Sequence, residues 1–92
     1  MIEISTTNTF DRLFQKLPRK IQIKAAKKTD LFKQNPFNPV LRIEKLHPPK
    51  HDVWSFRLDI HYRIVFKFVG SNRAELRFVG HHNKIYDYDI FR

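Results

Sequence analysis

The stretch from Val53 to Tyr88, VWSFRLDIHYRIVFKFVGSNRAELRFVGHHNKIYDY, decides the fold. Large apolar side chains alternate with polar, basic or smaller ones along its first two segments, at Trp54, Phe56, Leu58, Tyr62, Ile64, Phe66 and Phe68. A period of two is typical of a half-buried β-strand, because successive side chains point to opposite faces of a sheet. The stretch therefore predicts a β-meander with one aromatic face and one face that carries arginines and histidines.

A tight turn at Asp59 to His61 sets the register of the first two strands. This register pairs Phe56 with Ile64 and places Arg57 directly opposite Arg63. Two like charges that face each other are unfavourable in a sheet. The pair therefore indicates either a solvated, splayed arrangement or a site that holds an anion between two guanidinium groups.

The third strand of the meander is predicted over Ala74 to Val79. Pairing Phe66 with Phe78 keeps the large apolar side chains of both strands on one face. The same register brings Arg63 near His81. A histidine would then join the two arginines on the open side of the sheet.

Gly80 offers an alternative to this register. Glycine in a strand often marks a bulge, and a bulge here would shift the register by one residue and turn His82 to the open face in place of His81. Periodicity does not choose between the two histidines. The tail that follows is predicted to be a short helix or strand.

The N-terminal part predicts a short strand and two helices. Ile2 to Ser5 is the strand, and the first helix has an apolar stripe at i, i+3, i+4 and i+7. The members of this stripe are Phe10, Leu13, Phe14 and Leu17. Pro18 suits the first turn of a second helix that runs toward Gln34, and the two prolines of Asn35–Pro39 end that helix. The two helices are expected to form a hairpin.

The segment Leu41 to Glu44 alternates again and predicts another strand. An antiparallel register puts Glu44 beside Ser55 and Arg42 beside Arg57, so a carboxylate joins the basic face. The order of elements is β-α-α-β-β-β. The fold class is α+β, with an N-terminal helical hairpin packed on a mainly antiparallel sheet, and residues 1–92 are expected to form one domain.

The composition of the chain indicates which classes of partner and of site to expect. The chain has 18 Lys and Arg residues against 9 Asp and Glu residues, and a formal charge of +9 favours nucleic acid, an anionic membrane or an acidic protein as the partner. Without cysteine it has no thiol nucleophile and no thiolate metal site. The prolines of the His47–Asp52 loop exclude the helical turn that would join His47 to His51 at a metal. No phosphate-binding glycine motif occurs, so no cofactor and no metal are expected, and the absence of a long apolar run predicts a cytosolic protein rather than a membrane protein.

The whole chain resembles the RelE/ParE toxin superfamily of bacterial toxin–antitoxin systems. The likeness rests on a helical hairpin followed by LRIEKL, VWSFRLD, HYRIVFKF and LRFVGHHNKIYDY. The segments W-S-x-R and Y-R-I-V-F, together with the terminal G-x-H-x-x-x-Y, resemble most the RelE, YoeB, YafQ and HigB type of ribosome-dependent mRNA endonuclease. The resemblance implies a bacterial cytoplasmic toxin that enters the ribosomal A site, cleaves mRNA and is neutralised by an antitoxin, as a monomer or in a toxin–antitoxin hetero-oligomer.

The resemblance also implies site residues. Arg57 and Arg63 match the phosphate-contacting basic residues of the family, His82 matches the histidine of G-x-H, and Tyr86 matches the aromatic residue that follows it. Glu44 precedes the tryptophan by the same spacing as the general base of the YoeB type. The chain departs from RelE itself, which has basic residues near the position of the base and an arginine at that of His82.

The same constellation suits metal-free RNA cleavage. A base takes the proton of a ribose 2′-hydroxyl, the oxygen attacks the adjacent phosphorus, and an acid protonates the departing 5′-oxygen while cations stabilise the developing charge. Glu44, His82 and the arginine pair can fill these roles. Two alternatives remain: a ParE-like DNA gyrase inhibitor, which needs no catalytic histidine, and a plain RNA-binding module.

Overall fold

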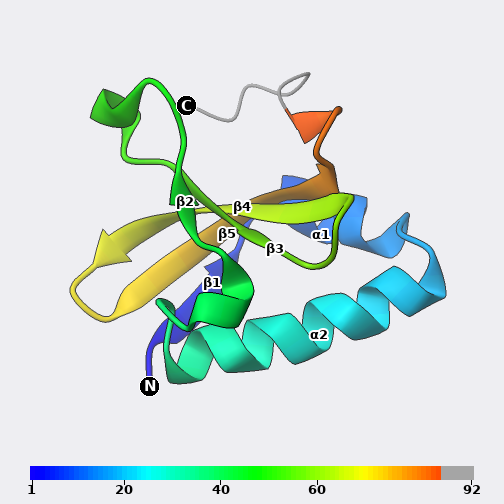
Figure 1. The fold of residues 1–92 in the computed structure, drawn as a ribbon, viewed down its shortest axis with the longest axis horizontal. Coiled ribbons are helices and arrows are strands. Elements are labelled where there is room, and N and C mark those ends of the chain that lie inside the picture. The colour runs from blue at the N-terminus through cyan, green and yellow to red at the C-terminus, as the bar shows by residue number, and fades with distance from the viewer. Residues whose placement is uncertain (86–92) are drawn as a thin grey trace.

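The computed structural model describes residues 1–85 of the chain. Both helices lie on one face of a five-stranded sheet (Figure 1). The elements are β1 (Glu3–Thr6), α1 (Asn8–Gln15), α2 (Arg19–Gln34), the 3-10 turn η1 (Pro39–Leu41), β2 (Glu44–Lys45), the 3-10 turn η2 (Pro49–His51), β3 (Trp54–Arg57), β4 (Tyr62–Gly70) and β5 (Arg73–His81). The strand order is β1-β5-β4-β3-β2, with β1 parallel to β5 and all other neighbours antiparallel. The predicted α+β class is confirmed, with the two helices after the first strand, and the helices are followed by four strands where the predicted order β-α-α-β-β-β has three.

The helix-covered face of the sheet is the predicted aromatic face. Phe32 of α2 is completely buried, stacks on Phe56 of β3 with ring centroids 4.8 Å apart, and meets Phe66 of β4 edge-on at 4.7 Å. Buried aromatic pairs of this kind contribute about 0.5–1.5 kcal/mol beyond the burial of their area. Ile21 and Ala25 continue the buried stripe of α2. The main core therefore lies between the helices and the sheet, and it leaves the opposite face to the polar and basic side chains.

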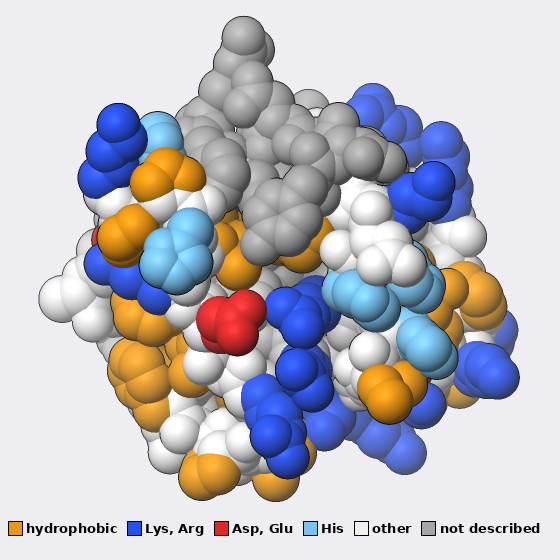
Figure 2. All heavy atoms as spheres, turned by 45° about the horizontal axis from the view of Figure 1, so that its top comes forward, with side chains coloured by type: hydrophobic (Ala, Val, Ile, Leu, Met, Phe, Trp, Pro, Cys, Tyr) orange, Lys and Arg blue, Asp and Glu red, His pale blue; other side chains and the backbone are white. Residues whose placement is uncertain are grey.

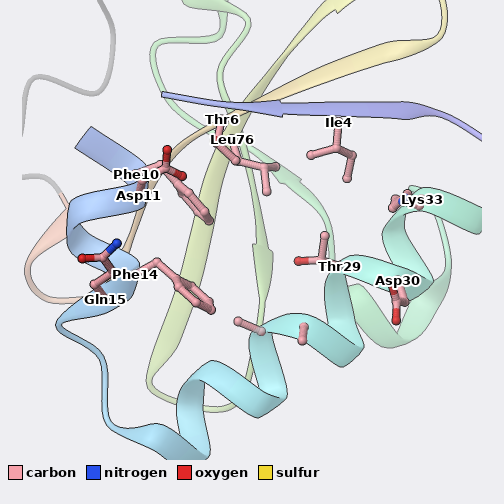
Figure 3. Close-up of a pocket in the computed structure, with 12 residues that line it drawn as sticks. Ile4, Thr6, Phe10, Asp11, Phe14, Gln15, Thr29, Asp30, Lys33 and Leu76 are labelled. Atoms are coloured by element: carbon pink, nitrogen blue, oxygen red, sulfur yellow. The ribbon is translucent and has the colours of Figure 1, made fainter. Parts of the chain in front are cut away.

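The two helices follow each other as predicted, and a groove of about 640 Å³ lies between them (Figure 3). The side chain of Gln22 donates a hydrogen bond to the carbonyl of Phe14 at 3.0 Å, which fixes the start of α2 to the end of α1. Phe10, Thr29 and Leu76 are among the lining residues, and none of the predicted site residues is. Neither α1 nor α2 is long and apolar enough to cross a membrane.

The register between β3 and β4 is the predicted one, but the register between β4 and β5 is not. Arg57 lies opposite Arg63. Phe66 lies opposite Leu76 rather than Phe78, and Phe78 lies opposite Val65. One residue of β5, Arg77, is therefore left over between two successive pairs and forms a bulge.

Thr7 holds this bulge in place. Its hydroxyl donates a hydrogen bond to the carbonyl of Arg77 at 3.2 Å and accepts one from the backbone N–H of Phe10 at 3.1 Å. The second bond is the N-cap of α1, which satisfies one of the free N–H groups of the first turn. A single side chain thus ties the start of α1 to the extra residue of β5. The prediction of a bulge at Gly80 is therefore wrong by three residues. The bulge is held by Thr7, and strand periodicity does not reveal this tertiary contact.

The strand before the meander is shorter than predicted. Glu44 lies opposite Ser55, as expected, but β2 contains only two residues. Arg42 has a left-handed backbone (φ 47°) and caps η1, so the expected pairing of Arg42 with Arg57 is wrong. The side chain of Asn38 caps the other end of η1, and Pro39 begins the turn. Local turn chemistry therefore overrides the alternating pattern at this point.

Candidate functional site

The open face, defined as the side of the sheet that the helices do not cover, combines a small apolar cluster with basic side chains. Its buried apolar residues are Leu46, Val53, Val65 and Ile85. In Figure 2 one acidic side chain lies against a strip of Lys and Arg side chains, and a group of histidine side chains lies on one side of this strip. The apolar cluster gives the strands rigid support. Polar groups on such a support are held in a fixed geometry.

Arg63 is the central residue of the predicted site. Its guanidinium Nη1 lies 3.3 Å from Oε1 of Glu44, and its side chain is only 20% exposed. Across the sheet it faces Arg57. Within the described residues no carboxylate pairs with Arg57. The structure therefore brings three predicted site residues together on β2, β3 and β4, with two guanidinium groups and one carboxylate at the same level of the sheet.

Gly80 leaves space on the other side of Arg63. It is the residue of β5 that pairs with Arg63. A Cβ atom placed on Gly80 would meet nothing within 4 Å, and the backbone of Gly80 does not have a positive φ. No backbone geometry thus demands glycine here. What the missing side chain provides is room next to a guanidinium group, where an anion can approach.

The two histidines after Gly80 lie at the end of β5. His81 pairs with Tyr62, and their rings make an edge contact with centroids 5.8 Å apart, so the predicted position of His81 near Arg63 is wrong. The cause is the pairing of Phe66 with Leu76, two residues from the predicted Phe78, of which the bulge at Arg77 makes up one residue before the end of the strand. Alternation then assigns His82 the same side of the sheet as Gly80 and Arg63. Tyr86, the fifth predicted site residue, lies outside the described residues.

His82 is tied to the turn between β3 and β4. Its backbone N–H donates to the carbonyl of His61 at 2.7 Å, and its ring Nδ1 lies 3.2 Å from the same oxygen. If Nδ1 carries the ring proton, this contact is a hydrogen bond and the lone pair is on Nε2. That tautomer leaves Nε2 as the nitrogen that can exchange a proton or bind an ion.

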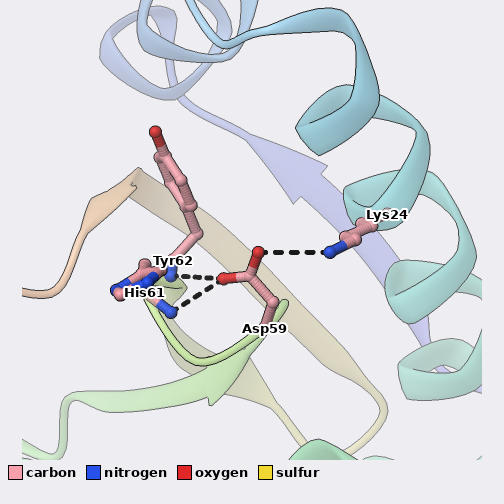
Figure 4. Close-up of polar contacts among 4 residues, drawn as sticks. All are labelled: Lys24, Asp59, His61 and Tyr62. Atoms are coloured by element: carbon pink, nitrogen blue, oxygen red, sulfur yellow. Dashed lines mark hydrogen bonds and ion pairs between the residues drawn. The ribbon is translucent and has the colours of Figure 1, made fainter.

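Asp59 fixes the backbone of the same turn. As Figure 4 shows, its Oδ1 accepts hydrogen bonds from the backbone N–H groups of His61 and Tyr62, each at 2.8 Å, and its Oδ2 lies 3.3 Å from Nζ of Lys24. Partial burial opposes ionisation of this carboxyl. The hydrogen bonds and the charge of Lys24 outweigh the burial and lower the pKa of Asp59. The turn that carries His61 is thereby anchored to α2.

His61, His81 and His82 form a cluster that periodicity did not predict. One ring nitrogen from each lies within 4.8 Å of the others. Desolvation lowers the pKa of His81, and the electrostatic influence of the neighbouring His82 and His61 lowers it further. The sequence signal is the hairpin register: once Tyr62 is paired with His81, the turn residue His61 must lie next to His82.

Comparison with known proteins reveals a likeness of fold. No family model and no curated protein matches the sequence. Among solved structures, YafQ from E. coli strain BL21(DE3) superposes with a TM-score of 0.75 at 11% identity, covering 94% of this chain and 99% of YafQ. A YoeB/ParE toxin from Agrobacterium tumefaciens has a TM-score of 0.72 at 21% identity, with 88% and 99% covered.

A third similar structure is that of the RelB–RelE antitoxin–toxin complex from Methanococcus jannaschii. The TM-score is 0.72 and the identity 23%, and the match covers 91% of this chain and 96% of that chain. These matches extend over almost the full length of each toxin chain. They agree with the two helices on a five-stranded mixed sheet described above. The chain therefore has the fold of the RelE/ParE toxin superfamily.

Proposed function

We propose that the chain is the toxin of a type II toxin–antitoxin system and acts as a ribosome-dependent mRNA endonuclease. The observation that carries this proposal is the environment of Arg63. Its guanidinium binds the carboxylate of Glu44 at 3.3 Å, faces Arg57 across β3 and β4, and borders the open space at Gly80. A base, two cations and a nearby histidine are the groups that cleavage of RNA by its own 2′-hydroxyl requires.

In this mechanism Glu44 acts as the general base. It takes the proton of the 2′-hydroxyl, and the oxygen attacks the adjacent phosphorus in line with the departing 5′-oxygen. His82 protonates that oxygen, so the products are a 2′,3′-cyclic phosphate and a 5′-hydroxyl. Arg57 and Arg63 neutralise the charge that develops on the phosphoryl oxygens. No step needs a metal ion.

The ion pair between Glu44 and Arg63 suits the substrate-free state of the proposed site. The carboxylate of Glu44 is 57% exposed, so solvent screens its attraction to Arg63 and a phosphate can replace it. Arg63 then turns from carboxylate to phosphate, and Glu44 becomes available as a base. Tyr86, assigned by the resemblance alone, would add an aromatic surface for a nucleotide base.

The ribosome is proposed to supply what the open face lacks. The described residues of the open face offer the charges of Glu44, Arg57 and Arg63, whereas the groove of about 640 Å³ lies on the helix side of the sheet. Positioning of reacting groups is worth several powers of ten in rate. We therefore expect free RNA to be cleaved poorly and mRNA in the ribosomal A site to be cleaved well.

An acidic antitoxin is the proposed protein partner. The formal charge of +9 favours association with an acidic segment, and this encounter should weaken as salt is added. Among the structures of the same fold, the one from M. jannaschii is a complex of toxin and antitoxin. We infer a toxin that acts in the bacterial cytoplasm as a monomer and that the antitoxin holds inactive in a hetero-oligomer.

The test uses a bacterial cell-free system to which the purified protein is added. Protein synthesis, cleavage of mRNA by primer extension, and supercoiling of a plasmid are followed in parallel. We expect synthesis to stop while supercoiling continues, with cuts in mRNA only where ribosomes translate. Loss of supercoiling before translation would instead identify a ParE-like gyrase inhibitor. RNA binding without cuts would identify an RNA-binding module.

A further inference from the structure

We propose that His61, His81 and His82 form a binding site for a divalent transition-metal ion of the Zn²⁺ type. The three side chains come from two segments that the hairpin brings together, the β3–β4 turn and the end of β5. One ring nitrogen from each lies within 4.8 Å of the other two. Three neutral imidazoles with an open fourth position are a typical ligand set for zinc.

The distances are close to those of an occupied site. With Zn–N bonds of about 2.0–2.1 Å, tetrahedral geometry places the nitrogens about 3.4 Å apart. The three nitrogens therefore need to approach one another by at most about 1.4 Å, which ring rotation can supply. His61 is exposed, so its ring can turn without disturbing the core. The rings of His81 and His82 are already neighbours, with centroids 4.7 Å apart.

The backbone around the cluster is organised before any ion arrives. Oδ1 of Asp59 accepts hydrogen bonds from the N–H groups of His61 and Tyr62 (Figure 4). The backbone N–H of His82 donates to the carbonyl of His61. These bonds fix where two of the three ligands leave the main chain. Preorganised ligands lose less conformational entropy on binding.

The tautomer of His82 also favours metal binding. When Nδ1 donates to the carbonyl of His61, the lone pair of the ring is on Nε2, which is then the nitrogen that can bind an ion. A metal-binding histidine commonly donates its second ring nitrogen to a carbonyl in this way. His81 is different, since its Nδ1 accepts the N–H of Asn83 at 3.2 Å. If His81 uses Nε2 for the metal, its proton moves to Nδ1 and this bond is lost.

The choice of ion follows from the ligands and their surroundings. Imidazole nitrogens suit zinc, copper and nickel, whereas magnesium and calcium require oxygen ligands. The carboxylate of Asp59 attracts a cation to the cluster and the ammonium group of Lys84 repels it. Neutral histidines are required, so binding should strengthen as the pH rises through the range in which imidazole loses its proton.

Metal at this site would remove the proposed general acid. The ion occupies Nε2 of His82, which then cannot protonate the departing 5′-oxygen. This consequence rests on the proposed function, whereas the binding of metal does not. The cluster would accordingly make the toxin inactive when zinc is bound and active when zinc is removed.

The experiment titrates the purified full chain with ZnCl₂ by isothermal titration calorimetry after removal of metal with EDTA. We expect one saturable site per chain. His61→Ala should weaken it by roughly 100-fold or more, since even loss of an outer-shell partner costs about 10- to 100-fold in affinity. His47→Ala is the matched control, because it removes another exposed histidine that is not part of the cluster, and it should leave the affinity within about twofold of the wild type.

A second readout keeps the test independent of how the variants fold. Two-dimensional ¹H–¹⁵N spectra of the histidine rings in the wild-type chain should show metal-induced shifts at His61, His81 and His82. Shifts confined to His47 and His51, equal affinities of wild type and His61→Ala, or no saturable binding would each overturn the site. Saturating Zn²⁺ should also abolish mRNA cleavage. Cleavage that persists with metal bound would contradict the role of His82 and not the metal site.

Discussion

The carboxylate of Glu44 lies 3.3 Å from the guanidinium of Arg63, and each belongs to a different strand of the open face. If Glu44 is the general base, Glu44→Gln keeps the shape and the hydrogen-bonding oxygen but loses the proton acceptor. Cleavage in the ribosomal assay should fall by about a hundredfold to ten-thousandfold. Stability should change by no more than about 1 kcal/mol, because the ion pair is exposed to solvent.

The control for Glu44→Gln is Glu3→Gln. Glu3 forms an exposed ion pair with Arg73 at 2.7 Å on β1 and β5, at the other edge of the sheet. This variant should cleave mRNA at the wild-type rate. A Glu44→Gln protein that cleaves as fast as the Glu3→Gln protein would exclude Glu44 as the base.

Gly80→Val tests whether the open space beside Arg63 is used by the substrate. A Cβ at Gly80 meets nothing within 4 Å, and valine suits a strand, so the melting temperature should not fall. The added side chain should nevertheless exclude the phosphate and lower cleavage by tenfold or more, which is about 1.4 kcal/mol of transition-state stabilisation. Gly70→Val, at the far end of β4, is the control. Equal cleavage by the two variants would show that the space at Gly80 is not part of the site.

Thr7→Val tests the link between α1 and the bulge. Valine has nearly the same shape but can neither cap α1 nor donate to the carbonyl of Arg77. Loss of an N-cap costs about 0.5–2 kcal/mol, and the unpaired carbonyl should place the loss toward the upper end. The free energy of unfolding in urea measures it. Thr6 is an exposed neighbour on β1, and Thr6→Val should leave the free energy of unfolding nearly unchanged. A similar loss of stability in both variants would show that Thr7 has no special role.

The carboxyl of Asp52 predicts how stability depends on pH. A hydrogen bond from the indole of Trp54 at 3.0 Å is the main cause that lowers the pKa of Asp52, and Lys45 lowers it further. Because the pKa is lower in the folded state, the stabilisation is present above the ordinary pKa of about 4 and is lost as the pH falls below it. The difference in unfolding free energy between wild type and Asp52→Asn should therefore shrink between pH 6 and pH 3. A constant difference would refute the assignment.

The sequence predicts the regular pairing of the strands more accurately than it predicts the bulge. Alternation in β3 and β4 specifies which side chains are buried and that Arg57 faces Arg63, since a shift of one residue would expose the aromatic face. The bulge could not be located in this way. Its position depends on a hydroxyl seventy residues away, that of Thr7, and a contact so distant in sequence leaves no trace in local periodicity.

The histidines illustrate the same limit within the candidate site. Gly80 suggested a bulge at that glycine, whereas the bulge lies at Arg77. The predicted pairing of Phe66 with Phe78 was also two residues away from the observed pairing with Leu76, so His81 was assigned the wrong partner. The contact between His61 and His82 follows only from the complete sheet, in which the β3–β4 turn meets the end of β5. Side chains inside strands were predictable, and side chains at turns and strand ends were not.

The most direct test of the proposed catalytic site is primer extension on translating ribosomes with wild type, His82→Ala and His81→Ala, with thermal melting of each protein. His82→Ala should lose cleavage by about a hundredfold or more while melting near the wild-type temperature, because a positioned acid is lost and no core side chain is. His81→Ala should lose much less activity. A stable His82→Ala protein that cuts mRNA as the wild type does would contradict the assignment.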